Sequence, residues 1–233
     1  MKTMRIGIIR VVTFDDETIL NAHGHVIERA FPYFNTLSRC VPDQRKGIYN
    51  QATLRVATPK VVRLGLQLQS EGVEALIVSC AEDPGVEKLR RCVEIPVIGA
   101  GSAAAGLALT LGSRVGALNL TTRTPNAIMK VLGKHFTAEA KPRNITTTLD
   151  LLKDKMKSEV FRAVAQLRNR GVDVVVLGCT GYTTMGVASE IQTELKVPVI
   201  DPILAAGLAA FYATQLPRIA RSHGDSGIFH SGE

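Results

Sequence analysis

Two cysteines stand at matching places in two similar segments of the chain. The segment GVEALIVSC ends at Cys80 and the segment GVDVVVLGC ends at Cys179, so the thiols are 99 positions apart, as are the glycines that open the segments. In each segment an apolar run typical of a buried strand leads to the cysteine, and a turn into a helix follows. A thiol beside helix N-termini is partly exposed and its thiolate is favoured. We therefore interpret both cysteines as reactive thiols.

A matched pair of thiols suits one kind of reaction. If two similar lobes face each other, the carboxyl ends of their strands converge on one cleft, and one thiol approaches from each side. A thiolate can then remove a proton from a stereogenic carbon while the opposite thiol delivers a proton to the other face. The pairing predicts inversion of a carbon centre by Cys80 and Cys179. Cys40 and Cys92 have no counterpart in the second segment, and we interpret them as structural.

The elements that must position these thiols can be read along the chain. Short apolar runs predict strands at 6–12, 36–40 and 75–79, and helical spacing predicts helices at 19–31 and 59–71. This βαβα order is typical of a parallel sheet with covering helices. We therefore predict an α/β fold. The segment GIYNQ either lines the cleft or starts a helix.

The repeat extends on both sides of the cysteines. Downstream, EIPVIGAGSAAAGLAL, from Glu94, resembles KVPVIDPILAAGLAAF, from Lys196. Upstream, RIGII, from Arg5, resembles RVGAL, from Arg114. Such self-similarity indicates two copies of one unit. It predicts two similar α/β lobes with parallel sheets, related by pseudo-twofold symmetry, with the active site in the cleft between them.

The repeat also suggests where the lobes begin and end. The final predicted helix, 203–216, occupies the place that 103–111 holds in the first copy, so we expect it to return to the first lobe. We therefore assign residues 1–99 plus 206–233 to the first lobe. We assign residues 100–205 to the second lobe.

Composition excludes several other classes of protein. The chain has 233 residues, of which 45% are hydrophobic and 21% charged, so a wholly disordered chain is excluded. No apolar run reaches the roughly 18 to 20 residues of a transmembrane helix, and the N-terminus lacks the apolar segment of a signal peptide. We expect a cytoplasmic protein without a membrane partner.

The net charge of +7 raises the question of a nucleic-acid partner. The basic residues are scattered, and the densest cluster, Lys88 with Arg90 and Arg91, lies on a predicted helix without interleaved aromatic residues. We interpret this cluster as a solvated face and expect no nucleic-acid partner. The surplus favours a small-molecule substrate with anionic character.

Three motifs resemble one known family. SCAEDPG at 79–85, LGCTGYT at 177–183 and VPVID at 197–201 are similar to motifs of the aspartate/glutamate/hydantoin racemase superfamily, and the resemblance covers essentially the whole chain. The first motif is closest to the hydantoin and allantoin racemase branch. The resemblance implies two flavodoxin-like lobes and racemisation by two cysteines without cofactor or metal. It also implies a homo-oligomer.

Carried over residue by residue, the resemblance assigns the catalytic thiols to Cys80 and Cys179. It places the substrate-binding residues in the turns beside the two thiols and in NLTTRT, which follows the strand RVGAL; they are Ser79, Asp83, Thr121, Thr122, Thr180 and Gly181. The threonines of NLTTRT have an alternative role as a helix N-cap before Pro125.

Two positions depart from the family pattern, and they point to different substrates. Gly181 stands where glutamate racemases have a histidine and aspartate racemases an acid, which favours an already acidified carbon such as C5 of a hydantoin ring. Arg10 replaces a residue of an Asn-Pro-Asn-like turn found in hydantoin racemases, and a guanidinium there could hold a carboxylate. The alternative for Arg10 is a surface arginine at a strand end.

We therefore predict a cofactor-independent racemase of the hydantoin racemase type. An amino-acid racemase or epimerase of the aspartate/glutamate type is the alternative, and a two-lobed small-molecule binding protein without chemistry is a second one. No metal site is expected, because the cysteines and histidines lack ligand spacing and His23 and His25 fall on different faces of one helix.

Overall fold

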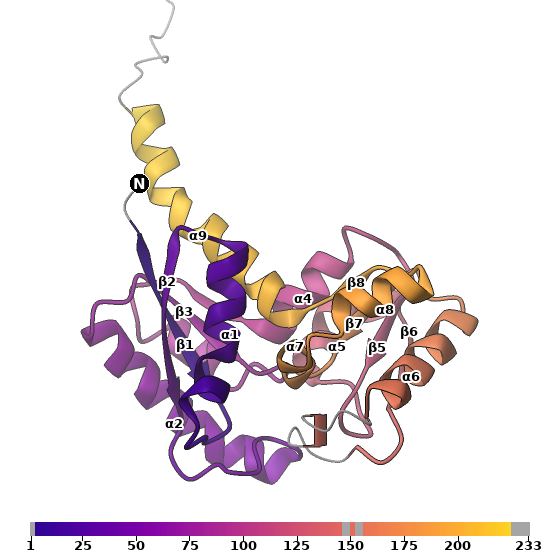
Figure 1. The fold of residues 1–233 in the computed structure, drawn as a ribbon. Helices are drawn as coiled ribbons and strands as arrows, with labels where there is room; N and C mark the ends of the chain where they lie inside the picture. The colour runs from indigo at the N-terminus through magenta and orange to yellow at the C-terminus, as the bar shows by residue number, and fades with distance from the viewer. Residues whose placement is uncertain (1–2, 146–149, 152–155, 225–233) are drawn as a thin grey trace, which may run out of the picture.

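The computed structural model describes residues 3–145, 150–151 and 156–224, with side chains up to residue 216. It contains two four-stranded parallel sheets, one in each lobe (Figure 1), with strand orders β2-β1-β3-β4 and β6-β5-β7-β8. The two orders are the same when the second set is numbered from its own first strand. The predicted α/β fold with two parallel sheets is confirmed.

The strands and helices follow the βαβα order. The strands are β1 (Met4–Arg10), β2 (Phe34–Cys40), β3 (Ala75–Ser79), β4 (Val97–Gly99), β5 (Val115–Leu118), β6 (Phe136–Ala140), β7 (Val174–Leu177) and β8 (Val199–Ile200). The helices are α1 (Glu17–Ala30), α2 (Gln51–Ser70), α3 (Val86–Arg90), α4 (Ala100–Ala108), α5 (Asn126–Leu132), the 3-10 turn η1 (Gly133–His135), α6 (Lys157–Asn169), α7 (Gly181–Met185), α8 (Ala188–Leu195) and α9 (Pro202–Gly224).

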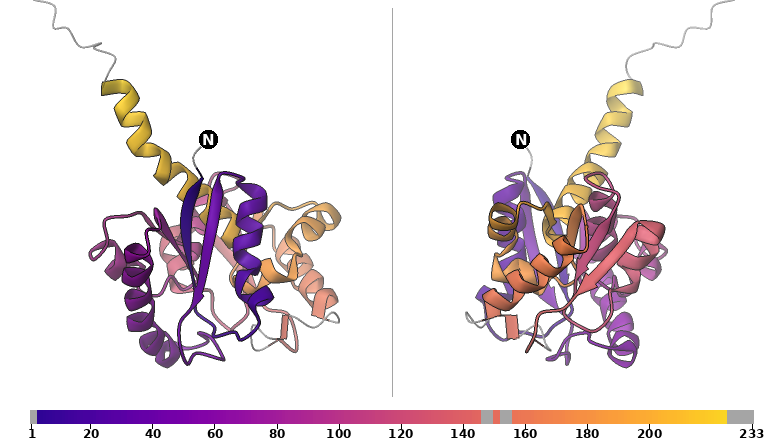
Figure 2. Two further views of the ribbon diagram at one scale, coloured as in Figure 1. Left: turned by 60° about the vertical axis from the view of Figure 1, so that its left-hand side comes forward. Right: turned by 90° about the vertical axis from the view of Figure 1, so that its right-hand side faces the viewer.

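The first sheet is covered on both faces, as the left view of Figure 2 shows with α1 and α2 on opposite sides. Side chains of β3 alternate between these faces: Leu76 and Val78 pack with α2, whereas Ala75 and Ile77 pack with α1 and α9. A strand buried on both faces has an unbroken apolar sequence. This explains the apolar run that precedes Cys80.

The second sheet is built in the same way. In β7, Val175 and Leu177 pack with α6 and α8, whereas Val174 and Val176 pack with α4 and α5. Helix α4 therefore follows the last strand of the first sheet but covers the second. Helix α9 follows the last strand of the second sheet and covers the first.

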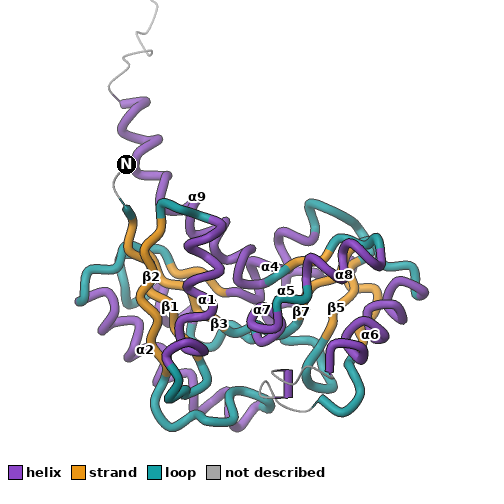
Figure 3. The backbone as a smooth tube through the Cα atoms, viewed as in Figure 1, coloured by secondary structure: helices purple, strands orange, loops and turns teal. Residues whose placement is uncertain are grey.

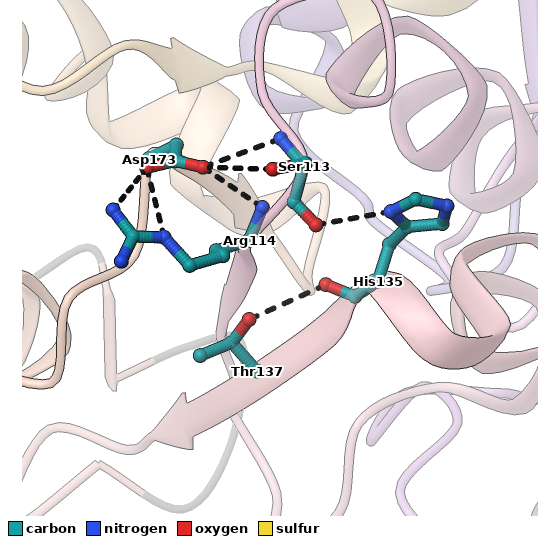
Figure 4. Close-up of polar contacts among 5 residues, drawn as sticks. All are labelled: Ser113, Arg114, His135, Thr137 and Asp173. Atoms are coloured by element: carbon teal, nitrogen blue, oxygen red, sulfur yellow. Dashed lines mark hydrogen bonds and ion pairs between the residues drawn. The ribbon is translucent and has the colours of Figure 1, made fainter.

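The start of each sheet repeats the same hydrogen bonds. The backbone N–H of Arg5 donates to the Glu74 carboxylate at 3.0 Å, and that of Arg114 donates to the Asp173 carboxylate at 3.0 Å. In return the N–H groups of Glu74 and Asp173 donate to the arginine carbonyls, each at 2.7 Å. In the second lobe the Arg114 guanidinium also reaches Asp173, and Ser113 links this pair to His135 (Figure 4). The repeated segments RIGII and RVGAL thus begin equivalent strands.

Helix α2 begins eight residues before the predicted start at Pro59. A capping box sets the true start: Asn50 Oδ1 accepts the Thr53 N–H at 2.9 Å, and Thr53 Oγ1 accepts the Asn50 N–H at 3.1 Å. Pro59 lies inside the helix, where it removes one backbone hydrogen bond. Burial of Ala57 and Val61 on either side holds the helix together across this position.

Helix α9 joins the end of the second lobe to the first sheet. Ile203, Ala206 and Ala210 pack against the first sheet, and the helix then extends away from the body of the molecule (Figure 1). Residues 225–233, which we assign to the first lobe, lie outside the described residues. Within the described ranges, no helix combines the length and the apolar character needed to cross a membrane.

Candidate active site

A cavity of about 320 Å³ lies between the lobes, and both Cys80 and Cys179 line it. Cys80 directly follows β3, and Cys179 comes two residues after the end of β7. The strands of each sheet are parallel, so their carboxyl ends meet at one edge, and the two edges face the same cavity. The short helix α7, which follows Cys179, lies in the centre of the molecule beside α1 (Figure 3).

Cys80 is buried, with 8% of its surface exposed. Burial raises the pKa of its thiol well above the usual value, and negative charge on Cys179, Asp83 and Glu82 would raise it further. The backbone N–H of Glu82 opposes these effects only in part. Cys80 is therefore a neutral thiol, able to donate a proton, at neutral pH.

Cys179 has a different environment. Its side chain is half-buried, and the Gly181 N–H donates to Sγ at 3.3 Å. The Arg10 guanidinium is close enough that its positive charge attracts a Cys179 thiolate. A backbone donor and a nearby cation both favour the charged form of this sulfur.

Arg10 is not the surface arginine of the alternative interpretation. Only 5% of it is exposed, and Nη1 donates to the carbonyls of Ile19 at 2.8 Å and Leu20 at 2.7 Å in α1. The guanidinium carbon lies 5.1 Å from the centre of the Phe14 ring, a cation–π contact. Burial lowers the pKa of Arg10 to about 10, which leaves it charged at neutral pH. The cavity therefore has a fixed internal cation.

The turns that carry the thiols are bonded to each other across the lobes. Thr180 Oγ1 donates to the Ser79 carbonyl at 3.3 Å. Ser79 Oγ lies 2.7 Å from His23 Nδ1, so this hydroxyl has a protein partner even though Ser79 lines the cavity. The second nitrogen of His23, Nε2, lies 2.9 Å from Thr184 Oγ1 on α7. No local sequence pattern points to this role of His23, since both partners are distant in the chain.

The loop after β5 brings Thr121 and Thr122 to the cavity. Neither threonine caps α5, because the residue at its N-cap is Pro125 and makes no side-chain cap bond. The loop is held instead by Glu139, whose carboxylate accepts the Thr124 N–H at 3.0 Å and the Thr124 hydroxyl at 2.7 Å. No sequence pattern points to Glu139, which lies on the neighbouring strand β6.

Asp83 is placed differently from its predicted role. It is not among the cavity residues, and its carboxylate accepts the N–H groups of Gly101 at 2.8 Å and Ser102 at 2.9 Å. The side chain therefore caps the start of α4. The reason is the turn itself: Asp83 has φ of 50° and Gly85 has φ of 73°, so the chain folds back toward α4.

The wall of the cavity contains residues whose role the sequence leaves open. Helix α2 and the segment before it supply Ile48, Tyr49 and Leu54, so GIYNQ both lines the cavity and starts the helix. Glu82, which also lines the cavity, accepts the Asn126 N–H at 3.1 Å and links the turn after Cys80 to α5. The cavity wall is thus partly apolar and partly polar. The apolar part includes Val11, Val12, Ile48, Leu54, Leu120 and Pro125.

The remaining cysteines lie outside this arrangement. Cys92 is exposed, and Cys40 Sγ accepts the Phe14 N–H at 3.5 Å. Neither lines the cavity. Among the residues that the structure describes, no group of three or more His, Cys, Asp or Glu side chains is arranged to hold a metal ion.

Comparison with known proteins identifies the family. A sequence model described as Asp/Glu/Hydantoin racemase matches residues 23–210. The chain belongs to this family. Hydantoin racemase from Rhizobium meliloti is 30% identical over 162 residues, which are 64% of this chain and 66% of that protein. Hydantoin racemase from Pseudomonas sp. strain NS671 is 28% identical over 64% of this chain and 62% of its own length. The matches thus cover slightly less than two thirds of these relatives.

Solved structures of the family share the fold. Allantoin racemase from Klebsiella pneumoniae superposes with a TM-score of 0.79 at 24% identity, covering 99% of this chain and 95% of that one. Glutamate racemase from Bacillus anthracis has a TM-score of 0.65 at 19% identity, covering 96% and 84%. At these identities the likeness concerns the fold, and it confirms the predicted two-lobed architecture.

Proposed function

We propose that this protein is a racemase of the hydantoin racemase type that inverts a carbon centre with two cysteines and no cofactor. The observation that carries the proposal is the placement of Cys80 and Cys179, which follow equivalent strands of two similar lobes and line one cavity. Racemisation by a two-base mechanism needs two proton-transfer groups on opposite sides of one carbon.

The different environments of the thiols assign their roles at rest. Cys80 is buried among acidic neighbours and stays protonated, whereas Cys179 has a backbone donor and the Arg10 cation. In one direction the Cys179 thiolate takes the proton: the C–H bond breaks and an S–H bond forms. The Cys80 thiol then gives its proton to the opposite face of the carbanion. Reversal of these steps converts the other enantiomer.

A hydantoin suits this cavity for two reasons. Gly181 has no side chain that could assist deprotonation beside Cys179. The substrate must therefore have a carbon that is already acidic, such as C5 of a hydantoin ring. The apolar part of the wall offers contacts for a substituent at C5 of the ring. Relatives named hydantoin racemase match the chain as well.

An amino-acid racemase remains a second candidate, because one observation favours it. Arg10 lines the cavity as a buried cation, and Arg123 lines it from the loop after β5. Guanidinium groups bind carboxylates well. A relative named glutamate racemase, from Levilactobacillus brevis, is 25% identical over 85% of this chain. In either case we propose a small-molecule substrate and a cytoplasmic, homo-oligomeric enzyme.

The test is to incubate the protein in D₂O with single enantiomers of 5-substituted hydantoins and, separately, of amino acids. We expect loss of the C5 proton signal and of optical activity with hydantoins, above the rate without protein. The same changes with amino acids only would assign the protein to the second candidate. Tight binding without exchange for every compound would contradict both and favour a non-catalytic binding protein.

A further inference from the structure

His23 is a buried imidazole that the proposed proton transfer does not use. It lies on α1 in the first lobe and is 1% exposed. Its Nδ1 lies 2.7 Å from Ser79 Oγ, and its Nε2 lies 2.9 Å from Thr184 Oγ1 in the second lobe. Ser79 directly precedes Cys80, and Thr184 is on the helix that follows Cys179. One side chain therefore contacts both segments that carry a thiol.

The chemistry of a neutral imidazole fits this position. One ring nitrogen carries a proton and the other a lone pair, while a hydroxyl can donate or accept, so both bonds form whichever nitrogen carries the proton. Burial and the positive charge of Arg10 lower the pKa of His23, which keeps the ring neutral. A buried imidazole nitrogen without a partner costs free energy, so both hydroxyls are held in place.

The bonds of His23 lie at the boundary between two hollows. His23 lines the cavity of the thiols, whereas Thr184 lines a second hollow between α1 and α8 and is absent from the first. On the same side, Thr180 Oγ1 donates to the Ser79 carbonyl at 3.3 Å. Ser79 is thus bonded to the second lobe twice, directly through its carbonyl and through His23 by its hydroxyl.

We infer that His23 is a positioning residue that fixes the spacing of Cys80 and Cys179 by holding Ser79 and Thr184 together. This inference rests on the proposed two-thiol reaction, which needs both sulfurs at reacting distance from one carbon at the same time. Small misplacements of such groups have large effects on rate. Without His23, we expect either thiol alone to remain able to exchange a proton.

Variants of Thr184 and His23 separate the two bonds. Thr184→Val removes the bond to the second lobe without altering the thiol cavity, and Thr184→Ser keeps the hydroxyl. His23→Asn keeps an amide near the place of Nδ1, close to Ser79, whereas His23→Gln keeps one near the place of Nε2, close to Thr184. Thr193→Val is the matched control, because Thr193 is on α8 and its hydroxyl donates to the Ser189 carbonyl of the same helix.

The first measurement starts from one enantiomer of a substrate in D₂O. It gives the ratio of deuterium incorporation into that enantiomer to its conversion into the other enantiomer. If the second thiol is misplaced, it cannot deliver its proton to the carbanion. The thiol that removed the proton then exchanges with solvent and returns a deuteron to the same face of the carbon. We expect Thr184→Val, His23→Asn and His23→Gln, each of which breaks one of the two bonds, to lose roughly ten- to a hundredfold in racemisation while this ratio rises. Thr184→Ser and Thr193→Val should stay near the wild-type ratio.

A role in folding alone predicts a different result. Loss of folded protein lowers exchange and racemisation together and leaves their ratio unchanged, so an unchanged ratio in Thr184→Val would overturn the inference. Thr184 is only half-buried, so we expect Thr184→Val to fold. The test can therefore be made with Thr184→Val even if the His23 variants do not fold.

The second measurement needs no substrate and therefore separates this inference from the proposed function. We expect iodoacetamide to label Cys80 several-fold faster in Thr184→Val than in wild type, because the lobes separate more readily, and at the wild-type rate in Thr193→Val. Equal labelling of Cys80 in all three proteins would contradict the inference even if no substrate is found. If wild type exchanges no substrate but labelling rises as expected, the proposed reaction fails and the role of His23 stands.

Discussion

At the scale of single residues, the two thiols differ although their sequence segments are nearly alike. Cys80 is buried beside Glu82 and Asp83, whereas Cys179 is half-buried with the Gly181 N–H and the Arg10 guanidinium nearby. The sequence repeat predicts the pair but not this difference. The difference depends on the burial of Cys80 and on the positive charge of Arg10, which acts on Cys179.

We expect this difference to appear in thiol labelling. Burial raises the pKa of Cys80, so Cys80 stays a thiol below that raised value and ionises only as the pH rises through it. Iodoacetamide reacts with thiolates, so Cys179 should be labelled before Cys80 at pH 7, as measured by mass spectrometry of the peptides. Exposed Cys92 gives the reference rate in the same sample. Labelling of Cys80 first would reverse the proposed roles.

At the scale of elements, contact with α4 holds the turn that follows Cys80. An added Cβ at Gly101 would lie 2.0 Å from the Ala81 carbonyl oxygen, whereas at Gly106, on the same helix, it would meet no atom within 4 Å. Asp83 caps the start of this helix from the same turn. The small residues of GAGSAAAG therefore allow α4 to approach the residues beside Cys80.

Alanine substitutions at these two glycines should have opposite effects. We expect Gly101→Ala to destabilise the fold by about 1–3 kcal/mol through overpacking and to slow the reaction by displacing Ala81. Gly106→Ala should stabilise it by about 0.5–1 kcal/mol, because alanine is the better helix former. Urea unfolding measures both changes. Equal stability of the two variants would show that α4 does not set the position of the turn.

The same elements show how far the sequence can be read. Strand β3 is predicted at its observed bounds, because a strand buried on both faces is an unbroken apolar run between clear turns. Helix α2 begins earlier than predicted because the cap at Asn50 outweighs Pro59. The family resemblance places Asp83 among the substrate-binding residues, but the sequence does not show the direction of its side chain, which caps α4. The bonds of His23 and Glu139 depend on long-range packing, which no local pattern reveals.

At the scale of the whole molecule, two similar lobes bring equivalent strand ends to one cavity. Equivalent hydrogen bonds begin both sheets, at Arg5 with Glu74 and at Arg114 with Asp173. Helices α4 and α9 each leave one lobe and cover the sheet of the other, which joins the halves around the cavity. The repeat in the sequence predicts the two sheets. The choice of substrate depends on the cavity wall, where the apolar residues favour a substituted hydantoin and Arg10 favours a carboxylate.

The most direct test of the two-thiol account is to compare Cys80→Ser and Cys179→Ser with wild type in D₂O, starting from each enantiomer of a converted substrate. We expect neither variant to racemise. Each should retain slow exchange of the carbon-bound proton from one enantiomer only, with opposite enantiomers for the two variants, because each remaining thiol reaches one face. Racemisation at the wild-type rate by either variant would contradict the account.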